Sequence, residues 1–247
     1  MTATTADEVP ELYRSGRAKR RRARIGRGVA YGAGLAAVVA FGLTADWDRI
    51  GEKYFDLDRA REMFPELVTI AAKNTVLITA MAFLGGVVLG LLAALMRLSS
   101  IRAYRWASAV YIEIFRGLPA LLTITLVGFL TPIALGFTWP RWFGVNAGGV
   151  VALSLVAGAY LAETVRAGIQ AVPKGQVEAA RSLGMPTGTA TRKIVLPQAF
   201  RIITPPLTNE LILLVKDSSL VYILGLSAQG FELTKYGRAI ANTNANL

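Results

Sequence analysis

The sequence predicts an all-α membrane protein, a bundle of helices that crosses a lipid bilayer several times. Hydrophobic residues occupy 53% of the 247 positions, and the mean hydropathy is positive at +0.46. Uncharged stretches close to the length of a membrane span recur along the chain, and basic residues gather between alternate stretches. Soluble domains seldom combine these features, because their surface helices carry a charged face.

Each candidate span is an uncharged stretch, since about 20 apolar residues are needed to cross a hydrocarbon core of about 30 Å. The first four are Gly28–Ala45, Val76–Met96, Leu118–Phe137 and Ala147–Ala162. The last of these reaches full length only if Glu163 and Arg166 enter the inner leaflet. The sequence therefore predicts four spans in its first two thirds.

A fifth candidate span runs from about Pro206 to Leu226 and contains Glu210, Lys216 and Asp217. Proline suits the first turn of a helix, so we expect this helix to begin at Pro205 and Pro206. The tail 227–247 has no apolar run long enough to span.

The distribution of basic residues predicts a cytoplasmic N-terminus, because loops on that side carry an excess of lysine and arginine. Sixteen basic residues fall in the segments that this orientation places inside, and seven fall in those that it places outside. The inside segments are 1–27, 97–106 and 167–201, and the outside segments are 46–66, 137–147 and 227–247.

The N-terminal arm 1–27 holds eight basic residues and runs directly into the first uncharged stretch. Nucleic-acid binding is one interpretation of such a cluster. A cytoplasmic anchor before a membrane helix is the simpler one, and it predicts contact with membrane lipid and no nucleic acid. A cleaved signal peptide is disfavoured, because Leu43-Thr44-Ala45 is a poor cleavage site.

The chain has no cysteine and no histidine. Disulfides, thiolate or imidazole metal sites and histidine-based catalytic triads are therefore excluded. There is also no G-x-x-x-x-G-K-[ST] phosphate-binding loop. We expect no metal, no cofactor and no catalytic residue.

The longest inside segment contains a patterned stretch, Val172–Gly184, followed after nine residues by Ile194-Val195-Leu196-Pro197. Its composition predicts a helix from about Gly175 to Leu183, with Gly184 as its C-terminal cap. A second helical stretch near Ala190–Val195 should end before Pro197. The pattern predicts a helical elbow outside the membrane.

The pattern Glu178-Ala179-Ala180, three residues, Gly184, nine residues, Ile-x-Leu-Pro resembles the EAA loop of bacterial ABC importer permeases. Three further segments resemble the branch that transports polar amino acids: Tyr111–Pro119, Ser154–Glu163, and Pro205–Glu210 with Lys216–Leu220. The resemblance covers roughly Val76 to Leu226.

This resemblance implies a type I importer fold in the bacterial cytoplasmic membrane, with a permease core from residue 67 to 247 and a coupling loop at 167–201. Residues 28–45 are then an added N-terminal membrane helix and 46–66 an external segment. Members normally have a further membrane helix, which we expect after residue 247.

The resemblance also implies partners. These are a cytoplasmic dimer of ABC ATPase subunits, a second permease subunit (the same or a related chain), an external solute-binding protein and an amino acid as substrate. The elbow would lie in a cleft of the ATPase and transmit its closing motion. The residues expected to couple are Glu178, Ala179, Ala180, Leu183 and Gly184.

Charged residues at membrane depth are costly and therefore predict a polar pathway or interhelical ion pairs. Glu113/Arg116 and Glu163/Arg166 each share a helical face by their spacing, while Ser218 and Ser219 suit a local break of the helix after Asp217. A zwitterionic amino acid needs cations or amides for its carboxylate and acids for its ammonium group. The candidate pathway residues are Glu113, Arg116, Glu163, Asn209, Lys216, Asp217 and Ser218.

Two alternatives remain open at the level of sequence. One is a secondary transporter driven by an ion gradient, with Asp217 or Glu163 as the proton carrier, although no inverted repeat is visible. The other is a membrane scaffold that transports nothing.

The pattern Gly86-x-x-x-Gly90 predicts close helix packing within the chain.

Overall fold

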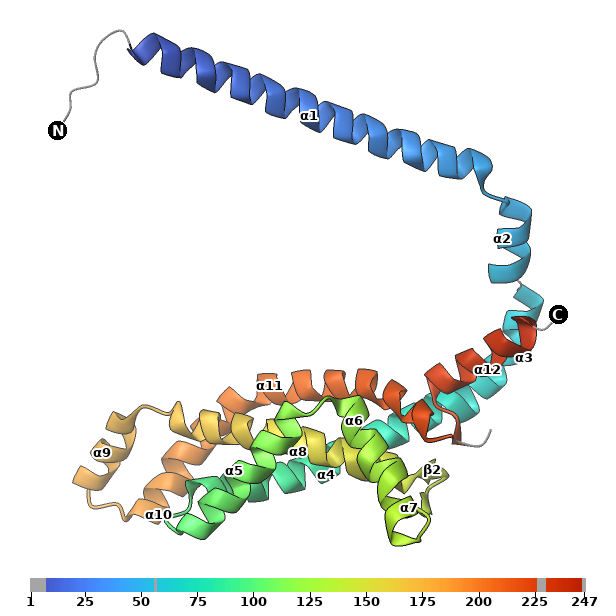
Figure 1. Cartoon of the computed structure of the whole chain (residues 1–247). Coiled ribbons are helices and arrows are strands. Elements are labelled where there is room, and N and C mark those ends of the chain that lie inside the picture. Colours follow the sequence, from blue (N-terminus) through green and yellow to red (C-terminus); the bar gives the residue numbers. More distant parts are fainter. Residues whose placement is uncertain (1–7, 56, 226–229, 246–247) are drawn as a thin grey trace. The chain divides into compact units, whose positions relative to one another are not determined.

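The computed structural model describes residues 8–55, 57–225 and 230–245, and contacts divide the chain into two units, 1–60 and 61–247. Each unit is described by itself (Figure 1). Residues 1–7 of the predicted arm, residue 226 of the predicted fifth span, and residues 227–229, 246 and 247 of the tail lie outside the described residues.

The first unit is dominated by one long helix, α1 (Glu8–Thr44), followed by α2 (Trp47–Tyr54). A helix of 37 residues is about 55 Å long, which exceeds what a bilayer core requires. Its part from Arg22 to Thr44 is long and apolar enough to span. The predicted arm and the predicted first span therefore form one continuous helix over the residues described. Asp46 begins α2, since its carboxylate accepts a hydrogen bond from the Arg49 N–H at 3.0 Å.

The second unit is a bundle of helices with one short hairpin. Its elements are α3 (Leu57–Glu66), the π-helix η1 (Leu67–Ala72), α4 (Lys73–Leu98), α5 (Arg102–Gly117), α6 (Ala120–Ile124), the π-helix η2 (Thr125–Leu130), α7 (Thr131–Leu135), β1 (Arg141–Trp142), β2 (Val145–Asn146), α8 (Ala147–Gln170), α9 (Lys174–Ser182), α10 (Thr187–Ala190), the π-helix η3 (Thr191–Val195), α11 (Leu196–Asp217), the 3-10 helix η4 (Ser218–Leu224) and α12 (Leu233–Ala245).

The close packing of α4 on α8 organises this bundle. A methyl group added at Gly86 would lie 2.8 Å from the Cβ of Ala157, and one added at Gly90 would lie 2.7 Å from the Cβ of Leu161. The two backbones approach this closely only because small residues line the contact. The prediction from the Gly86-x-x-x-Gly90 pattern is confirmed.

The order of these contacts fixes the direction of the helices. Positions 86 and 90 of α4 meet positions 157 and 161 of α8, so the two helices run parallel. Gly168 of α8 faces Ile203 of α11, whereas Gly149 faces Val221 of η4, so α11 and η4 run antiparallel to α8. The C-terminal end of α4, the C-terminal end of α8 and the start of α11 therefore lie at one end of the bundle, which we call the elbow end because α9 and α10 connect there (Figure 1).

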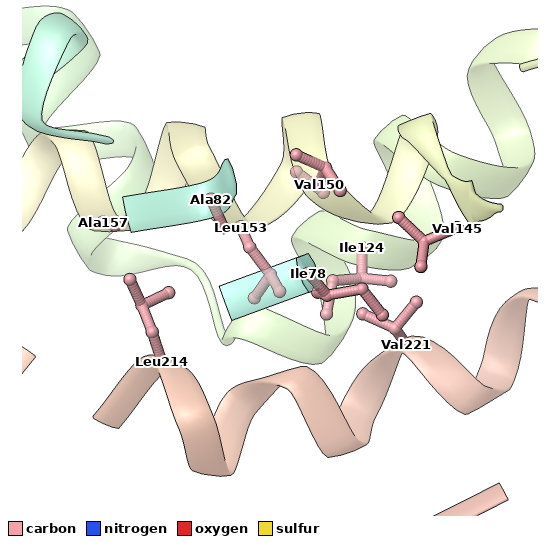
Figure 2. Packing of buried hydrophobic residues seen from close by; sticks show 10 residues of the cluster. Ile78, Ala82, Ile124, Val145, Val150, Leu153, Ala157, Leu214 and Val221 are labelled. Carbon is pink, nitrogen blue, oxygen red and sulfur yellow. The ribbon is translucent and has the colours of Figure 1, made fainter. Parts of the chain in front are cut away.

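The largest apolar cluster lies in the half of the bundle away from the elbow, and two smaller clusters lie nearer to it. Ile78 of α4, Ile124 of α6 and Leu153 of α8 are fully buried in one cluster with Leu214 of α11 and Val221 of η4. Figure 2 shows these side chains converging from the separate helices. In a bilayer the attraction between these helices comes mainly from such close packing, because lipid tails are as apolar as the side chains.

The segment between the second and fourth predicted spans differs from the prediction. The third span was expected at Leu118–Phe137, but α6, η2 and α7 cover only 120–135 and are preceded by α5, which meets them at an angle of 110°. Ser108 of α5 donates to the Ala93 carbonyl of α4 at 2.7 Å, and Tyr111 donates to the Leu155 carbonyl of α8 at 2.8 Å. The four charged residues of α5 hid this helix from a search for uncharged runs.

Two predicted helix boundaries are wrong. The helix expected to begin at Pro205 and Pro206 begins at Leu196, and both prolines lie inside α11. Helical structure also continues past Val195, with Pro197 in the first turn of α11, where a missing N–H needs no partner. Packing of Ile203 and Leu214 on either side of the proline pair keeps α11 in one piece.

The number of spans is not fixed by helix length and composition alone. Among the described residues, three single helices and the bent pair α5 with α6–α7 are apolar enough to cross a membrane: Arg22–Thr44, Ala60–Leu98, Ala147–Gln170, and Arg102–Gly117 with Ala120–Leu135. The predicted fifth span, now α11, is not among these segments, since prolines, polar residues and charged residues lower its mean hydropathy. The second span is also longer than predicted, since a continuous helix begins within the segment 46–66.

The end of the bundle opposite the elbow is tied together by hydrogen bonds to α12. The Asn74 amide donates to the Phe231 carbonyl at 2.9 Å, and the Leu233 N–H donates to the Thr75 hydroxyl at 3.2 Å. Buried Glu232 accepts from the N–H groups of Thr234 and Lys235 and so caps the helix.

Replacing Gly90 with valine should disrupt the contact between α4 and α8. The added Cβ would also lie 3.0 Å from the Gly158 carbonyl oxygen, so backbone must move, at a cost of about 1–3 kcal/mol. We expect a lower thermal unfolding midpoint in detergent for Gly90→Val. The control Val88→Leu changes an exposed position of the same helix and should leave the midpoint unchanged. Equal midpoints for both variants would contradict this view of the contact.

Candidate functional site

The elbow is a compact helical unit that joins the C-terminal end of α8 to the start of α11 (Figure 1). Its first helix, α9, spans Lys174–Ser182, close to the predicted range, and ends at Gly184, which has φ +83°. The Gly184 N–H donates to the Arg181 carbonyl at 2.9 Å, and the Met185 N–H donates to the Ala180 carbonyl at 3.1 Å. These two bonds form a Schellman motif, so the predicted glycine cap is confirmed.

The five predicted coupling residues divide into two groups by exposure. Leu183 has 82% of its surface exposed, and Glu178, Ala179 and Gly184 are exposed beside it. Ala180 is 3% exposed and therefore belongs to the interior of the elbow. An exposed leucine on a rigid, capped helix end offers an apolar contact to another protein, whereas Ala180 keeps the elbow itself tightly packed.

A cavity of about 460 Å³ lies where two helices are interrupted. The first interruption is Gly117-Leu118-Pro119, between α5 and α6, and the second is the change from α helix to 3-10 helix after Asp217. Val156 and Tyr160, from the middle of α8, form the opposite wall. The local break predicted after Asp217 is not a gap in the helix, because the backbone stays helical and changes only from α to 3-10. This change meets the interruption between α5 and α6, which the sequence did not reveal.

The polar groups of this cavity carry both signs of charge. Arg116 enters from the end of α5, and Glu210 and Asp217 enter from α11. The Arg116 guanidinium lies 5.3 Å from the centroid of the Tyr160 ring, a cation–π contact that orients the cation. Glu210 and Asp217 are seven residues apart, so they lie on one face of α11 two turns from each other. The cavity therefore brings together a guanidinium and two carboxylates, the charges that complement the two ends of a zwitterion.

The structure places the other predicted pathway residues elsewhere. Glu163 forms an ion pair with Arg166, with an Oε2 to Nη2 distance of 2.7 Å. Ser218 is buried, and its hydroxyl donates to the Val215 carbonyl at 2.7 Å, so it stabilises the helix break. Glu113 lines a different cavity, and Asn209 and Lys216 are exposed on α11.

Sequence reasoning missed Tyr160 and Glu210. Glu210 was noted only as an interruption of an apolar stretch, although its spacing of seven from Asp217 indicates a shared helical face. Tyr160 lies in an otherwise small-residue stretch of α8, and a single large aromatic residue there was a further available signal.

A family model covers the part of the chain that contains these features. Residues 86–244 match the family described as binding-protein-dependent transport system inner membrane components. The chain belongs to this family. Its matched region contains α5, the elbow, α11 and every residue of the cavity.

Several relatives of this chain are named as permeases for amino acids. The arginine transport system permease protein ArtQ of Bacillus subtilis is 43% identical over 57% of this chain and 63% of its own length. A putative glutamine transport system permease protein GlnP of Rickettsia conorii is 38% identical over 66% of this chain and 74% of its own. The L-cystine transport system permease protein TcyB of Bacillus subtilis is 37% identical over 66% of this chain and 68% of its own.

Solved structures confirm the fold. A crystal structure of an amino acid ABC transporter with histidines matches with a TM-score of 0.69 and 36% identity, over 77% of this chain and 84% of the other. An inward-facing methionine ABC transporter, MetNI, matches with a TM-score of 0.59 and 24% identity, over 75% of this chain, which supports the fold alone. The bundle therefore has the fold of a type I ABC importer permease, as the sequence predicted.

Gly184 offers a matched pair of substitutions that separates backbone shape from surface contact. A left-handed residue with a Cβ costs roughly 1–2 kcal/mol, but asparagine tolerates this conformation and valine does not. Space is not the obstacle, because nothing lies within 4 Å of an added Cβ. We expect Gly184→Val to lose association with the ATPase, measured by co-purification, while Gly184→Asn retains most of it and both variants insert in the membrane. Full retention by the valine variant would contradict a required cap.

Proposed function

We propose that this chain is the membrane-spanning permease subunit of an ATP-driven ABC importer of polar amino acids. The observation that carries the proposal is the exposed, rigidly capped elbow α9–α10, which lies at the end of the bundle where α8 stops and α11 begins. A displacement of the elbow is transmitted directly to both helices. Both helices also line the cavity at the two helix breaks.

A separate ATPase supplies the free energy in this proposal. Leu183 and Ala179 of the elbow enter a cleft of the ATPase dimer, and Glu178 and Gly184 border the contact. Ala180 acts from within, by keeping the elbow rigid. Closing of the two ATPase subunits moves the elbow as one body, which is how a rigid contact drives a change between two states.

The cavity between the helix breaks is the proposed solute site. Binding sites of membrane transporters occur near mid-depth, where interrupted helices leave backbone groups and charges available. Arg116 binds the carboxylate of an amino acid, Asp217 and Glu210 bind its ammonium group, and Tyr160 positions the arginine. The proposal of a polar amino acid as substrate is supported by the names of the arginine, glutamine and cystine permeases among the relatives.

A second permease subunit is supported by the exposed polar face of α11. Lys216 and Asn209 are exposed in the single chain, and Lys216 lies between the levels of Ile203 and Val221, which contact the two ends of α8. A lysine facing hydrocarbon at this depth would cost several kcal/mol. We infer that a second copy or a related chain covers this face, and that water in the pathway solvates the charged groups. The Glu163–Arg166 ion pair has a structural role in this proposal and stabilises the bundle.

The remaining partners follow from this arrangement. The elbow end faces the bacterial cytoplasm, with the N-terminus on the same side and α1 as an added membrane helix. An external solute-binding protein delivers the amino acid to the opposite end, and it supplies most of the specificity.

Uptake into proteoliposomes tests the proposal directly. The permease, its ATPase and its binding protein should take up a labelled amino acid only with internal ATP, and uptake should disappear when the phosphate-binding lysine of the ATPase is replaced. A protonophore should have no effect. Uptake that continues without ATP and stops with the protonophore would contradict the proposal and support an ion-driven carrier.

Removing the charge of Arg116 should weaken solute binding in the cavity. A hydrogen bond to a charged group contributes roughly 1.5–3 kcal/mol, so we expect Arg116→Gln to raise the KM of uptake about tenfold or more. Arg116→Lys should recover part of this loss. The control Arg201→Gln removes an exposed charge of α11 outside the cavity and should leave KM unchanged. An unchanged KM for Arg116→Gln would exclude the cavity as the solute site.

A further inference from the structure

A second cavity, of about 570 Å³, lies between the end of α4 and α5, along residues 102–113. Three arginines line it, Arg97 from α4 and Arg102 and Arg105 from α5. Its other walls are the apolar side chains of Trp106, Ala109 and Val110 and the carboxylate of Glu113. The cavity therefore has a net positive charge, because the single carboxylate of Glu113 does not neutralise three guanidinium groups.

Two of the arginines are held in place by the backbone. The Arg97 Nη1 donates to the Arg105 carbonyl at 3.3 Å. The Arg105 Nη1 donates to the Ser99 and Ser100 carbonyls at 3.1 and 2.9 Å. Each guanidinium has five N–H donors, so both retain donors for a further acceptor. Fixed arginines lose little conformational freedom on binding, and their planar fork matches the oxygens of a phosphate.

The position of the cavity identifies the source of such a phosphate. Arg97 lies in the last turn of α4 and Arg102 begins α5, so the cavity is at the elbow end of the bundle, where the membrane helices reach the interface. Trp106 is 73% exposed beside it, and Val110 and Ile114 continue an exposed apolar surface along α5 toward the interior of the membrane. Tryptophan favours the headgroup level of a bilayer. A cationic pocket that opens onto an apolar helix surface fits a ligand with an anionic head and acyl chains.

We propose that this cavity binds the phosphate headgroup of an anionic phospholipid from the leaflet at the elbow end. Arg97, Arg102 and Arg105 bind the phosphate oxygens, Trp106 packs at the glycerol level, and the chains follow Val110 and Ile114. Glu113 favours a headgroup with a hydroxyl or ammonium donor beside the phosphate. The bound lipid stabilises the turn from α4 to α5, and it does so whichever solute the bundle transports.

The experiment uses the full chain in nanodiscs of phosphatidylcholine that contain a trace of photoactivatable lipid. The photoactivatable lipid is either phosphatidylglycerol or phosphatidylcholine with the same chains and the reactive group near the glycerol. After illumination, mass spectrometry measures the adducts on peptides from residues 98–116. We expect a several-fold higher yield with phosphatidylglycerol in the wild-type chain. One arginine near an anionic headgroup contributes about fivefold in affinity, so Arg102→Gln should reduce that excess about fivefold, and Arg102→Lys should keep most of it.

The control Arg201→Gln removes an exposed arginine outside the cavity and should keep the full excess. Arg102 is the arginine to replace, because Arg97 and Arg105 bond to backbone carbonyls near the turn and their loss could disturb its fold. Equal yields for the two lipids in the wild-type chain would overturn the proposal. An undiminished excess of phosphatidylglycerol adducts in both Arg102→Gln and the double variant Arg97→Gln/Arg102→Gln would also overturn the proposal. Loss of the phosphatidylglycerol adduct on adding inorganic phosphate at constant ionic strength would assign the cavity to a free anion instead. No transport is measured, so none of these results depends on the proposed function.

Discussion

The close contact between α4 and α8 is the constraint on which the rest of the bundle depends. Gly86 and Gly90 meet Ala157, Gly158 and Leu161 with no room for another carbon atom. In a membrane there is little hydrophobic gain from bringing helices together, so such interdigitation of small residues and backbone supplies the attraction. The contact also sets the register and the parallel direction of the two helices. Because of that direction, the end of α4 with Arg97 and the end of α8 with its elbow lie on the same side.

The functional features then occupy different levels of the bundle. The elbow and the arginine-lined cavity lie at one end, the largest apolar cluster lies in the other half, and the mixed-charge cavity borders that cluster at the middle of α8. At this middle level the interruption between α5 and α6 meets charges of both signs. The Gly117-Leu118-Pro119 break and the 3-10 turn after Asp217 are costly irregularities in a lipid environment, and they are tolerated where neighbouring helices or water satisfy the backbone.

Much of this could be predicted from the sequence because hydropathy and small-residue spacing are local signals. The long apolar helices, the packing of Gly86 and Gly90 and the glycine cap at position 184 were all predicted from short stretches. The half-span α5 could not be recognised in the same way, since its charged residues face a cavity and the membrane interface. The proline pair in α11 was misleading because tertiary packing of Ile203 and Leu214 overrides the local preference for a helix start.

The candidate site was predicted less completely than the fold. Arg116 and Asp217 lie in different helices, and nothing in their sequence separation shows that they line one cavity. Glu163 and Ser218 are polar too, yet the first is paired with Arg166 and the second bonds to its own helix. Which buried polar group faces a cavity and which is satisfied locally depends on helix rotation, and rotation is set by packing that the sequence pattern does not encode.

Site-directed cross-linking of the elbow tests the central claim most directly. The chain has no cysteine, so Leu183→Cys introduces a single reactive thiol at the exposed end of α9. A short bifunctional reagent should link this thiol to a cysteine placed in the cleft of the ATPase, and the yield should change when ATP is added. The matched thiol of Phe143→Cys, at the exposed hairpin beyond the opposite end, should give no such product. If position 183 reacted only from outside the cell, or never reached the ATPase while transport continued, the elbow could not be the coupling element.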